Sequence, residues 1–423
     1  MKKYILLALI AVSALWLVLT EQTTKVSQPA VEADKGRPEP RRPQLQRSLN
    51  EYLSELVANG YSPALQAVLI ETLDGQALAE YNADTPLNPA SVMKLATSYL
   101  ALQRYSPDYR FKTLAYTTGI IDPAAKTLYG DIVIEAEADP HFTVKEAEEL
   151  AAAIRKQQIK RVVGNLIFKG HLRFYRRWST EYAQAKMKKI LALTIEADIN
   201  PKQTQERTLL AVHYSKPLKE LLLYMNAHSD NFYADQLGEA LGGPEAMKRH
   251  LQQEFKLASH EIEISAASGL DYNRITARAS LAIQRKLIMV LAKHGMKIED
   301  IMPVAGVDSG TLVTRFRSEQ LRGVVIGKTG TLNVTDSGVS VLQGVVYTKQ
   351  HGPILYAVFN MGGDVHRFRK LQDKFLEDAL AELRAELIAV RTENIFGEVT
   401  AQVAKVTRPK ILAKRKTRLR SRA

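Results

Sequence analysis

Two apolar runs near the start of the chain flank a turn signal. Residues 67–70 and 76–81 lie on either side of Asp74-Gly75. Both positions of this dipeptide tolerate a positive φ, so the pattern predicts a β-hairpin. Over residues 91–105 the apolar positions then recur at helical spacing. We therefore expect an antiparallel hairpin followed directly by a helix.

The next part of the chain mixes strand and helix patterns. Residues 111–136 and 161–168 are typical of strands, the first of them broken at Asp122-Pro123. Residues 144–157, between the two, have the spacing of a helix. We interpret this part as an insertion.

Helices fill the middle of the chain, and strands return near its end. Residues 217–241 predict one helix or a helix pair ending at Gly242-Gly243, and residues 277–294 predict another helix. Three apolar strand candidates and an amphipathic helix follow, at residues 324–329, 338–348, 353–361 and 366–387. Strands thus bracket the helices at both ends of the domain, which indicates a mixed α/β (α+β) fold.

The first residues have the form of an export signal. Lys2 and Lys3 precede an unbroken apolar run over residues 4–19. The run falls between the usual lengths of a signal core and a membrane-spanning helix. Cleavage after the small residues 12–14 would leave residues 15–19 as an apolar stub, which favours an uncleaved anchor. In either case we expect the bulk of the chain to be exported, to the periplasm or another extracytoplasmic space.

Positive charge is concentrated at the C-terminal end of the chain. The formal net charge of the 423 residues is +13, and nine basic residues follow Glu398, the last acidic one. These nine are Lys405, Arg408, Lys410, Lys414, Arg415, Lys416, Arg418, Arg420 and Arg422. The body is nearly balanced, so no nucleic-acid partner is indicated. The tail is either a solvated end or a segment that holds anionic lipid or wall polymer outside the cell.

Cofactor and metal chemistry have little support in the sequence. The chain has no cysteine, which excludes disulfides, thiolate catalysis and thiolate metal sites. His141 and His228 lie near sequence motifs, but no pair of histidines has metal-ligand spacing. We predict no cofactor and no metal site.

Ser91 and Lys94 stand one turn apart at a helix start, so their side chains share one face within hydrogen-bonding reach. A serine becomes a strong nucleophile when a base takes its proton, and a lysine kept neutral by burial or by a nearby cation can be that base. The helix start also offers a backbone N–H and a positive dipole end to a developing oxyanion. The alternative is an ordinary helix N-cap beside a solvated lysine.

The triplet Ser229-Asp230-Asn231 lies within the helical stretch 217–241, where serine and asparagine are poor helix formers. A second hydroxyl near the lysine would relay a proton to a leaving amine, and the asparagine amide would hold a substrate peptide bond. The alternative is a capping turn.

The sequence Lys328-Thr329-Gly330-Thr331 follows an apolar strand. The glycine lets a ligand approach the backbone, and an extended substrate can pair with such a strand edge. A lysine and a threonine hydroxyl side by side suit a carboxylate, and the N–H after the glycine would complete an oxyanion pocket with that of Ser91. The alternative is a strand that ends in a turn.

Together the three motifs are those of penicillin-binding proteins and class A β-lactamases. Over roughly residues 60–365 the chain resembles the class C low-molecular-mass penicillin-binding proteins, the D-alanyl-D-alanine carboxypeptidase and endopeptidase family. Further motifs carry this resemblance: Asn88-Pro89-Ala90-Ser91, Asp139-Pro140, Ser215-Lys216-Pro217-Leu218, Ser268-Gly269-Leu270, Asn273-Arg274, Pro303-Val304-Ala305-Gly306, Gly310-Thr311-Leu312 and Gly327-Lys328-Thr329-Gly330-Thr331-Leu332. The four motifs between residues 268 and 312 are not β-lactamase features.

The resemblance implies a transpeptidase-like fold, in which an antiparallel sheet covered by helices lies beside a helical subdomain. It also implies no cofactor and an acyl-enzyme on Ser91, with Lys94 as general base. Ser229 and Asn231 would shuttle a proton and hold the substrate. The substrates would be peptidoglycan stem peptides, and β-lactams would acylate the same serine. The implied parts of the chain are a signal or anchor (1–20), a linker (21–47), a catalytic domain (48–104 and 205–390), an inserted subdomain (105–204) and a basic tail (391–423).

By the same resemblance, Lys328 and Thr329 would bind the terminal carboxylate. The chain departs from the family in a shortened β-rich insertion and in Lys169, where an aspartate is usual. An acidic residue that reads the peptide side chain has no clear match, with Glu181 after Trp178 the nearest candidate. The sequence leaves open carboxypeptidase against endopeptidase action, a serine β-lactamase, and a wall-binding protein that keeps the fold without catalysis.

Overall fold

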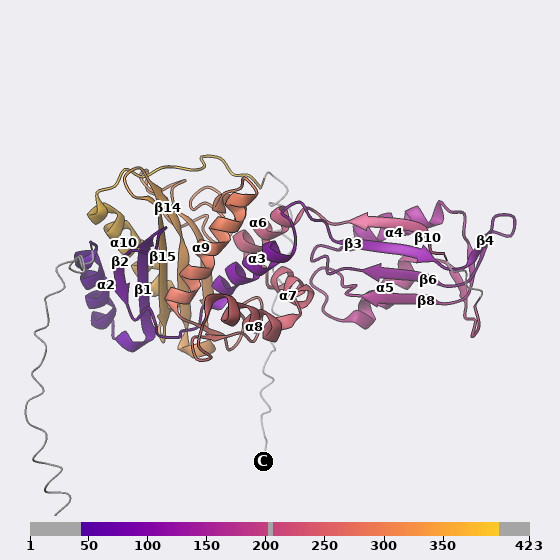
Figure 1. The fold of residues 1–423 in the computed structure, drawn as a ribbon, viewed down its shortest axis with the longest axis horizontal. Coiled ribbons are helices and arrows are strands. Elements are labelled where there is room, and N and C mark those ends of the chain that lie inside the picture. Colours follow the sequence, from indigo (N-terminus) through magenta and orange to yellow (C-terminus); the bar gives the residue numbers. More distant parts are fainter. Residues whose placement is uncertain (1–43, 202–205, 397–423) are drawn as a thin grey trace, which may run out of the picture. The chain divides into compact units, whose positions relative to one another are not determined.

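A five-stranded antiparallel sheet lies between helices in the part of the fold that holds both ends of the described chain (Figure 1). The computed structural model describes residues 44–201 and 206–396. The strand order is β13-β14-β15-β1-β2, and the strands are β1 (Gln66–Thr72), β2 (Ala77–Tyr81), β13 (Ile326–Leu332), β14 (Val339–Thr348) and β15 (Gly352–Met361). The predicted hairpin forms, with Gly75 at φ 91° in its turn.

Helices cover both faces of this sheet. Alternate residues of β1 enter different cores, Leu69 the one shared with α3 (Met93–Arg104) and α9 (Ala277–Lys293), and Ile70 the one shared with α2 (Gln46–Ala58) and α10 (Val365–Leu383). Because neither face meets water, the strands read as unbroken apolar runs. The predicted α+β class and the helix-covered antiparallel sheet are confirmed.

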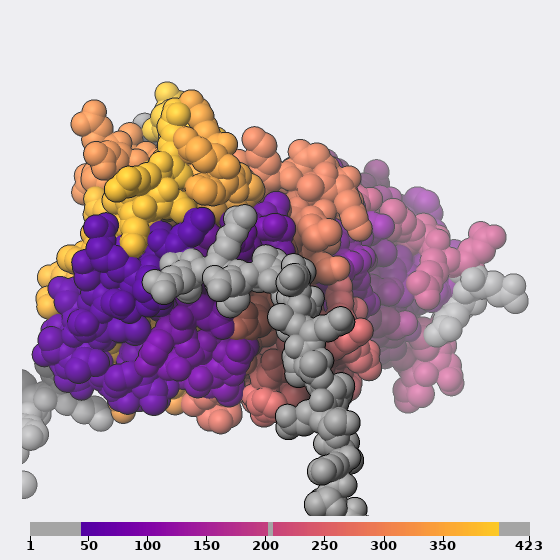
Figure 2. Space-filling model, turned by 60° about the vertical axis from the view of Figure 1, so that its left-hand side comes forward, coloured from indigo at the N-terminus to yellow at the C-terminus, as the bar shows by residue number. Residues whose placement is uncertain are grey.

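The first and last described helices pack against each other. Tyr52 of α2 stacks on Phe375 of α10 with ring centroids 4.5 Å apart, and the Glu382 carboxylate accepts a hydrogen bond of 2.8 Å from the N–H of Ser48. Figure 2 shows the N-terminal and C-terminal colours side by side on this face. Helix α2 begins at Gln46, inside the segment predicted as a linker, because buried Leu45 and the residues after it supply an apolar stripe.

The predicted insertion holds two further sheets around a core of its own. One has the order β10-β3-β6-β8 and the other β4-β5-β7-β9. The strands are β3 (Lys112–Thr117), β4 (Ile120–Asp122), β5 (Thr127–Tyr129), β6 (Ile132–Ala136), β7 (Arg161–Val163), β8 (Leu166–Gly170), β9 (Thr194–Glu196) and β10 (Thr208–Tyr214). Helices α4 (Val144–Arg155) and α5 (Thr180–Leu191) accompany them.

Helix α5 was missed from the sequence. Only Ala183, Met187 and Leu191 of its residues are buried, so its apolar stripe is one residue wide and easily overlooked. Strands β9 and β10 were missed as well. The domain boundaries derived from the sequence stay predictions.

Three helices form a region beside the sheet: α6 (Leu218–His228), α7 (Asn231–Ala240) and α8 (Gly243–Phe255). The predicted helix pair, α6 and α7, is therefore present and ends at Ala240, just before Gly242-Gly243, where both glycines have a positive φ and α8 begins. With only Met247 and Leu251 buried, α8 gave a weak apolar pattern. A two-stranded ribbon, β11 (Ile262–Glu263) with β12 (Arg274–Ile275), precedes α9.

The predicted export segment, residues 1–20, and the nine basic residues of the tail lie outside the described residues. Within 44–201 and 206–396, no helix combines the length and apolarity that crossing a membrane demands. The start of the predicted tail is described: Arg391 pairs with the buried carboxylate of Asp308 and donates to the carbonyl of Glu299 at 2.9 Å.

Candidate active site

Ser91 lies in a single 3-10 turn, Ala90–Val92, that runs into α3. The residue before it, Ala90, has φ 45°, a left-handed conformation that costs free energy and is common at functional sites. Its N–H donates to Asn88 Oδ1 at 2.9 Å. A Cβ at Gly269 would lie 1.9 Å from the Ala90 carbonyl oxygen, and one at Gly330 would lie 3.0 Å from Ala90 Cβ. Two glycines therefore make room for this strained turn.

The amine of Lys94 is buried directly behind the serine. It lies 3.0 Å from Ser91 Oγ and donates to Asn231 Oδ1 at 2.7 Å and to the Ser268 carbonyl at 2.6 Å. Burial lowers the pKa of Lys94 to about 7, although the charge of Asp235 opposes this shift. A substantial fraction of the amine is therefore neutral at neutral pH, and a neutral amine accepts a proton.

The Ser229-Asp230-Asn231 triplet occupies the break between α6 and α7. Ser229 takes a left-handed conformation, φ 55°, and Asp230 caps α7 by accepting from the Tyr233 N–H at 3.1 Å. The triplet is thus a capping turn and also a source of polar groups for the site. Asn231 reaches Lys94, as described above.

Lys328 of β13 has no exposed surface. Its Nζ donates to Ser229 Oγ at 2.9 Å and to the Thr329 carbonyl at 2.6 Å. Burial, followed by the nearby charge of Lys94, lowers the pKa of Lys328 well below its usual value. The amine therefore lies beneath the site, in contact with the second serine.

These groups meet at one cavity of about 320 Å³. Its lining residues are Ser91, Ser229, Thr311, Thr314, Arg315, Thr329, Thr331 and Arg369. Of the residues predicted for the site, Ser91, Ser229, Thr329 and Thr331 line the cavity, Lys94, Asn231 and Lys328 reach it by hydrogen bonds, and Gly330 lies in the adjoining strand.

Four lining residues were not predicted as site residues. Thr311 belongs to a motif quoted above for the resemblance, and Thr314 and Arg315 follow it closely. Arg369 lies near the start of α10, where an amphipathic pattern marks the buried face but not a face that meets a cavity.

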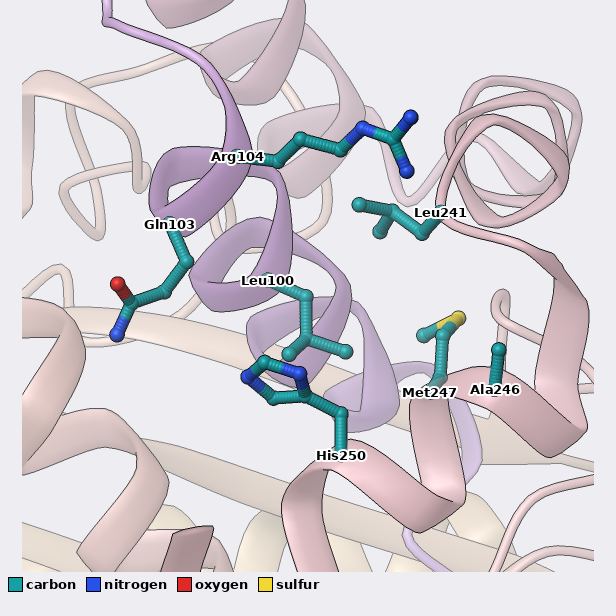
Figure 3. Close-up of a pocket in the computed structure, with 7 residues that line it drawn as sticks. All are labelled: Leu100, Gln103, Arg104, Leu241, Ala246, Met247 and His250. Atoms are coloured by element: carbon teal, nitrogen blue, oxygen red, sulfur yellow. The ribbon is translucent and has the colours of Figure 1, made fainter.

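A second cavity, of about 460 Å³, contains none of the predicted residues. It lies between α3 and the α7–α8 region (Figure 3), lined by Leu100, Gln103, Arg104, Leu241, Ala246, Met247 and His250. Among the described residues, no group of three or more His, Asp or Glu side chains is placed to hold a metal ion.

The sequence profile of the D-Ala-D-Ala carboxypeptidase 3 (S13) family matches residues 49–172 and 169–387. The chain belongs to this family. The resemblance to low-molecular-mass penicillin-binding proteins inferred from the motifs is thereby confirmed.

A curated relative, the D-alanyl-D-alanine carboxypeptidase DacB of Haemophilus influenzae, is 31% identical over 178 residues, which are 38% of this chain. The match spans only 35% of the relative's length, about a third of it.

Two solved structures share the fold. Penicillin-binding protein 4 of Haemophilus influenzae, complexed with a β-lactam, has a TM-score of 0.63 at 22% identity and covers 79% of this chain and 99% of its own. A predatory endopeptidase of Bdellovibrio bacteriovorus, acylated by penicillin G and bound to an immunity protein, has a TM-score of 0.60 at 23% identity, with coverages of 78% and 95%.

Proposed function

We propose that the protein is a serine-type D-Ala-D-Ala peptidase that cleaves peptidoglycan stem peptides through an acyl-enzyme on Ser91. The observation that carries the proposal is the Lys94 amine, with a pKa of about 7, lying 3.0 Å from Ser91 Oγ at the wall of a cavity. A hydroxyl paired with a neutral amine is an activated nucleophile. Membership of the S13 family agrees with this chemistry.

In the first half of the reaction, neutral Lys94 takes the proton of Ser91 as Oγ attacks the carbonyl carbon of the scissile D-Ala-D-Ala bond. In this proposal the N–H groups of Ser91 and Thr331 hold the oxyanion that forms. The residues that precede them, Ala90 and Gly330, approach closely, since a Cβ on Gly330 would lie 3.0 Å from Ala90 Cβ. The C–N bond then breaks, and Ser229 passes a proton to the departing amine. Water later attacks the ester, which restores Ser91 and releases the shortened peptide.

In this proposal Lys328 acts on Ser229 and not on the substrate carboxylate. Its amine donates to Ser229 Oγ, and with no exposed surface it offers a ligand nothing to contact. Asn231 accepts from Lys94 through Oδ1, which leaves its amide N–H groups for the substrate backbone.

The cavity also bears on the β-lactamase alternative. Rapid hydrolysis of a penicilloyl ester needs a base that activates water, and the described residues that line the cavity include no Asp or Glu. We therefore expect a long-lived adduct, as in a penicillin-binding protein, with stem-peptide trimming or cross-link cleavage as the natural reaction. The substrate lies outside the cytoplasm, so we also propose an extracytoplasmic, periplasmic location, with residues 1–20 as the export signal or anchor.

Incubation with penicillin G tests the proposal directly. Mass spectrometry should find one penicilloyl group, located on Ser91, and the wild type should release D-Ala from a stem pentapeptide. Ser91→Ala should lose both properties. Ser179→Ala, at the exposed N-cap of α5, should keep both. An adduct that persists unchanged in Ser91→Ala would overturn the proposal, as would an adduct located elsewhere.

A further inference from the structure

After α10 the chain continues as a segment that runs toward α6 (Figure 1), residues 386–396, which we call the C-terminal strap. Its backbone is fixed along the way. The N–H of Ile388 donates to the Tyr347 carbonyl at 2.9 Å, and that of Val390 donates to the Gly323 carbonyl at 2.8 Å. The S13 profile match ends at residue 387. Most of the strap is therefore an addition to the part of the chain that the family profile describes.

Arg391 fixes the middle of the strap to a buried carboxylate. Its guanidinium pairs with Asp308, whose side chain has no exposed surface, and donates to the Glu299 carbonyl at 2.9 Å. Asp308 also accepts from the N–H of Val304 at 2.8 Å. A buried ion pair of this kind is costly to break, because one partner would stay charged without compensation. The strap is therefore held firmly to the loop of residues 304–311.

The same loop supports the backbone that leads to Ser229. The N–H of Thr311, a residue that lines the cavity, donates to the Ala227 carbonyl at 2.9 Å. A Cβ at Gly310 would lie 2.2 Å from that carbonyl oxygen, so the approach depends on a glycine. Two residues further on, Ser229 has the left-handed φ of 55° and meets the amine of Lys328. The loop therefore helps to set the conformation of the second serine.

Phe396 makes a second and more direct contact at the same place. Its ring lies edge-on against the ring of His228, with the ring centroids 5.2 Å apart. His228 directly precedes Ser229, and its Nε2 is buried without a hydrogen-bond partner among the described residues. On its other ring neighbour, Tyr224, the centroid distance is 4.5 Å. The position of the His228 ring therefore depends on packing, and Phe396 supplies part of that packing.

We infer that the C-terminal strap positions Ser229 for proton transfer to the leaving amine, through the packing of Phe396 on His228. Arg391 anchors the strap. This inference rests on the proposed function, in which Ser229 protonates the leaving group. Neither Phe396 nor Arg391 lines the cavity, so both act through other residues and are positioning residues.

The strap should affect only one step of the reaction. Ser91 and Lys94 are held separately, by the turn before α3 and by the Ser268 carbonyl. When an amide is cleaved, the departing nitrogen must take up a proton as the C–N bond breaks. In a thioester analogue, with sulfur in place of that nitrogen, the C–S bond breaks and the sulfur leaves as a thiolate, since a thiol has a pKa of about 8.5. Both substrates need the nucleophile and its base, but only the amide needs a positioned Ser229.

The amide-to-thioester ratio of kcat/KM, measured on the full-length protein, tests the inference, because kcat/KM reports acylation. Ser229→Ala gives the reference, a fall of about 100-fold or more, which is the usual contribution of a general acid. In Phe396→Ala the ratio should fall about 10-fold or more, because a small displacement of a reacting group is enough for such a loss. The thioester value should stay near that of the wild type, which also shows that the variant is folded. Phe396→Leu, which keeps an apolar side chain against His228, should recover most of the loss.

Ile395→Ala is the matched control. It shortens the neighbouring apolar side chain of the strap, which is 48% exposed, and should leave the ratio at the wild-type value. A wild-type ratio in Phe396→Ala would overturn the inference, and so would an equal loss with both substrates. In either case Ser91 acylation, and with it the proposed function, would stand. A wild type that cleaves neither substrate would instead remove the proposed function itself.

Discussion

The amine of Lys94 donates a hydrogen bond of 2.6 Å to the backbone carbonyl of Ser268. The N–H of the same Ser268 donates to Asp235 Oδ1 at 2.8 Å. One residue of backbone therefore links a carboxylate on α7 to the buried amine on α3. Thr97 supports this segment by donating to the carbonyl of Ala267 at 2.7 Å. Asp235 thus positions the acceptor of Lys94 and also places a negative charge near it.

The pH dependence of acylation should report this charge. Burial sets the pKa of Lys94 at about 7, and the charges of Asp235 and then Asp230 raise it against burial. Removal of one of these charges must lower the pKa further. Asp230 and Lys328, the other charged groups near Lys94, are not altered by this substitution. We predict that the rate of acylation by penicillin G rises with pH around a midpoint near 7 in the wild type, and around a lower midpoint in Asp235→Asn.

The asparagine keeps an oxygen that accepts from Ser268, so the geometry is retained while the charge is lost. The measurement is the second-order rate constant of acylation from about pH 5 to about pH 9. Glu239→Gln removes an exposed carboxylate from the same helix and should leave the midpoint in place. A midpoint in Asp235→Asn equal to or above that of the wild type would contradict the electrostatic role of Asp235.

Buried lysines also make stability depend on pH. The folded-state pKa of Lys328 lies well below the value of 10.5 that applies when the chain is unfolded. Between those two values the unfolded chain holds a proton that the folded chain lacks, so the free energy of unfolding must rise with pH. Each such group adds a slope of up to about 1.4 kcal/mol per pH unit.

Denaturant unfolding at about pH 7, 8 and 9 should therefore give a steeper rise for the wild type than for Lys328→Met, which no longer titrates. Lys374→Met replaces an exposed lysine whose pKa is raised by its bond to Asp378, and it should not reduce the slope. If Lys328→Met and the wild type gain stability equally over this range, Lys328 does not lose its proton on folding.

Local sequence patterns predicted the central sheet and the three motifs well, since β1, β2 and β13 carry their signals within a few residues. Helix α8 was missed because only two of its residues are buried. Asp235 had a usable signal, as it lies four residues after Asn231 on the same helix face. No sequence signal marked Arg369, because its hydrogen bond to the Thr331 hydroxyl depends on how α10 lies against β13. The burial of Lys328 likewise depends on packing that no local pattern encodes.

The fit of Gly269 against Ala90 gives the sharpest test of the strained turn before Ser91. Gly269 and Gly243 have nearly equal left-handed φ angles, 81° and 82°. A Cβ at Gly269 would lie 1.9 Å from the Ala90 carbonyl oxygen, whereas a Cβ at Gly243 would meet nothing within 4 Å. Alanine at either position incurs the conformational penalty, about 1–2 kcal/mol. Only at Gly269 must the backbone before the nucleophile also move.

We therefore predict that Gly243→Ala loses about 1–2 kcal/mol of stability and keeps the wild-type rate of acylation. Gly269→Ala should lose more stability and at least about 100-fold in rate, because a displacement of about 1 Å at a reacting group costs that much. Denaturant unfolding and penicillin G acylation of the two purified variants measure both quantities. Equal acylation rates in the two variants would show that the position of Ala90 does not control the reactivity of Ser91.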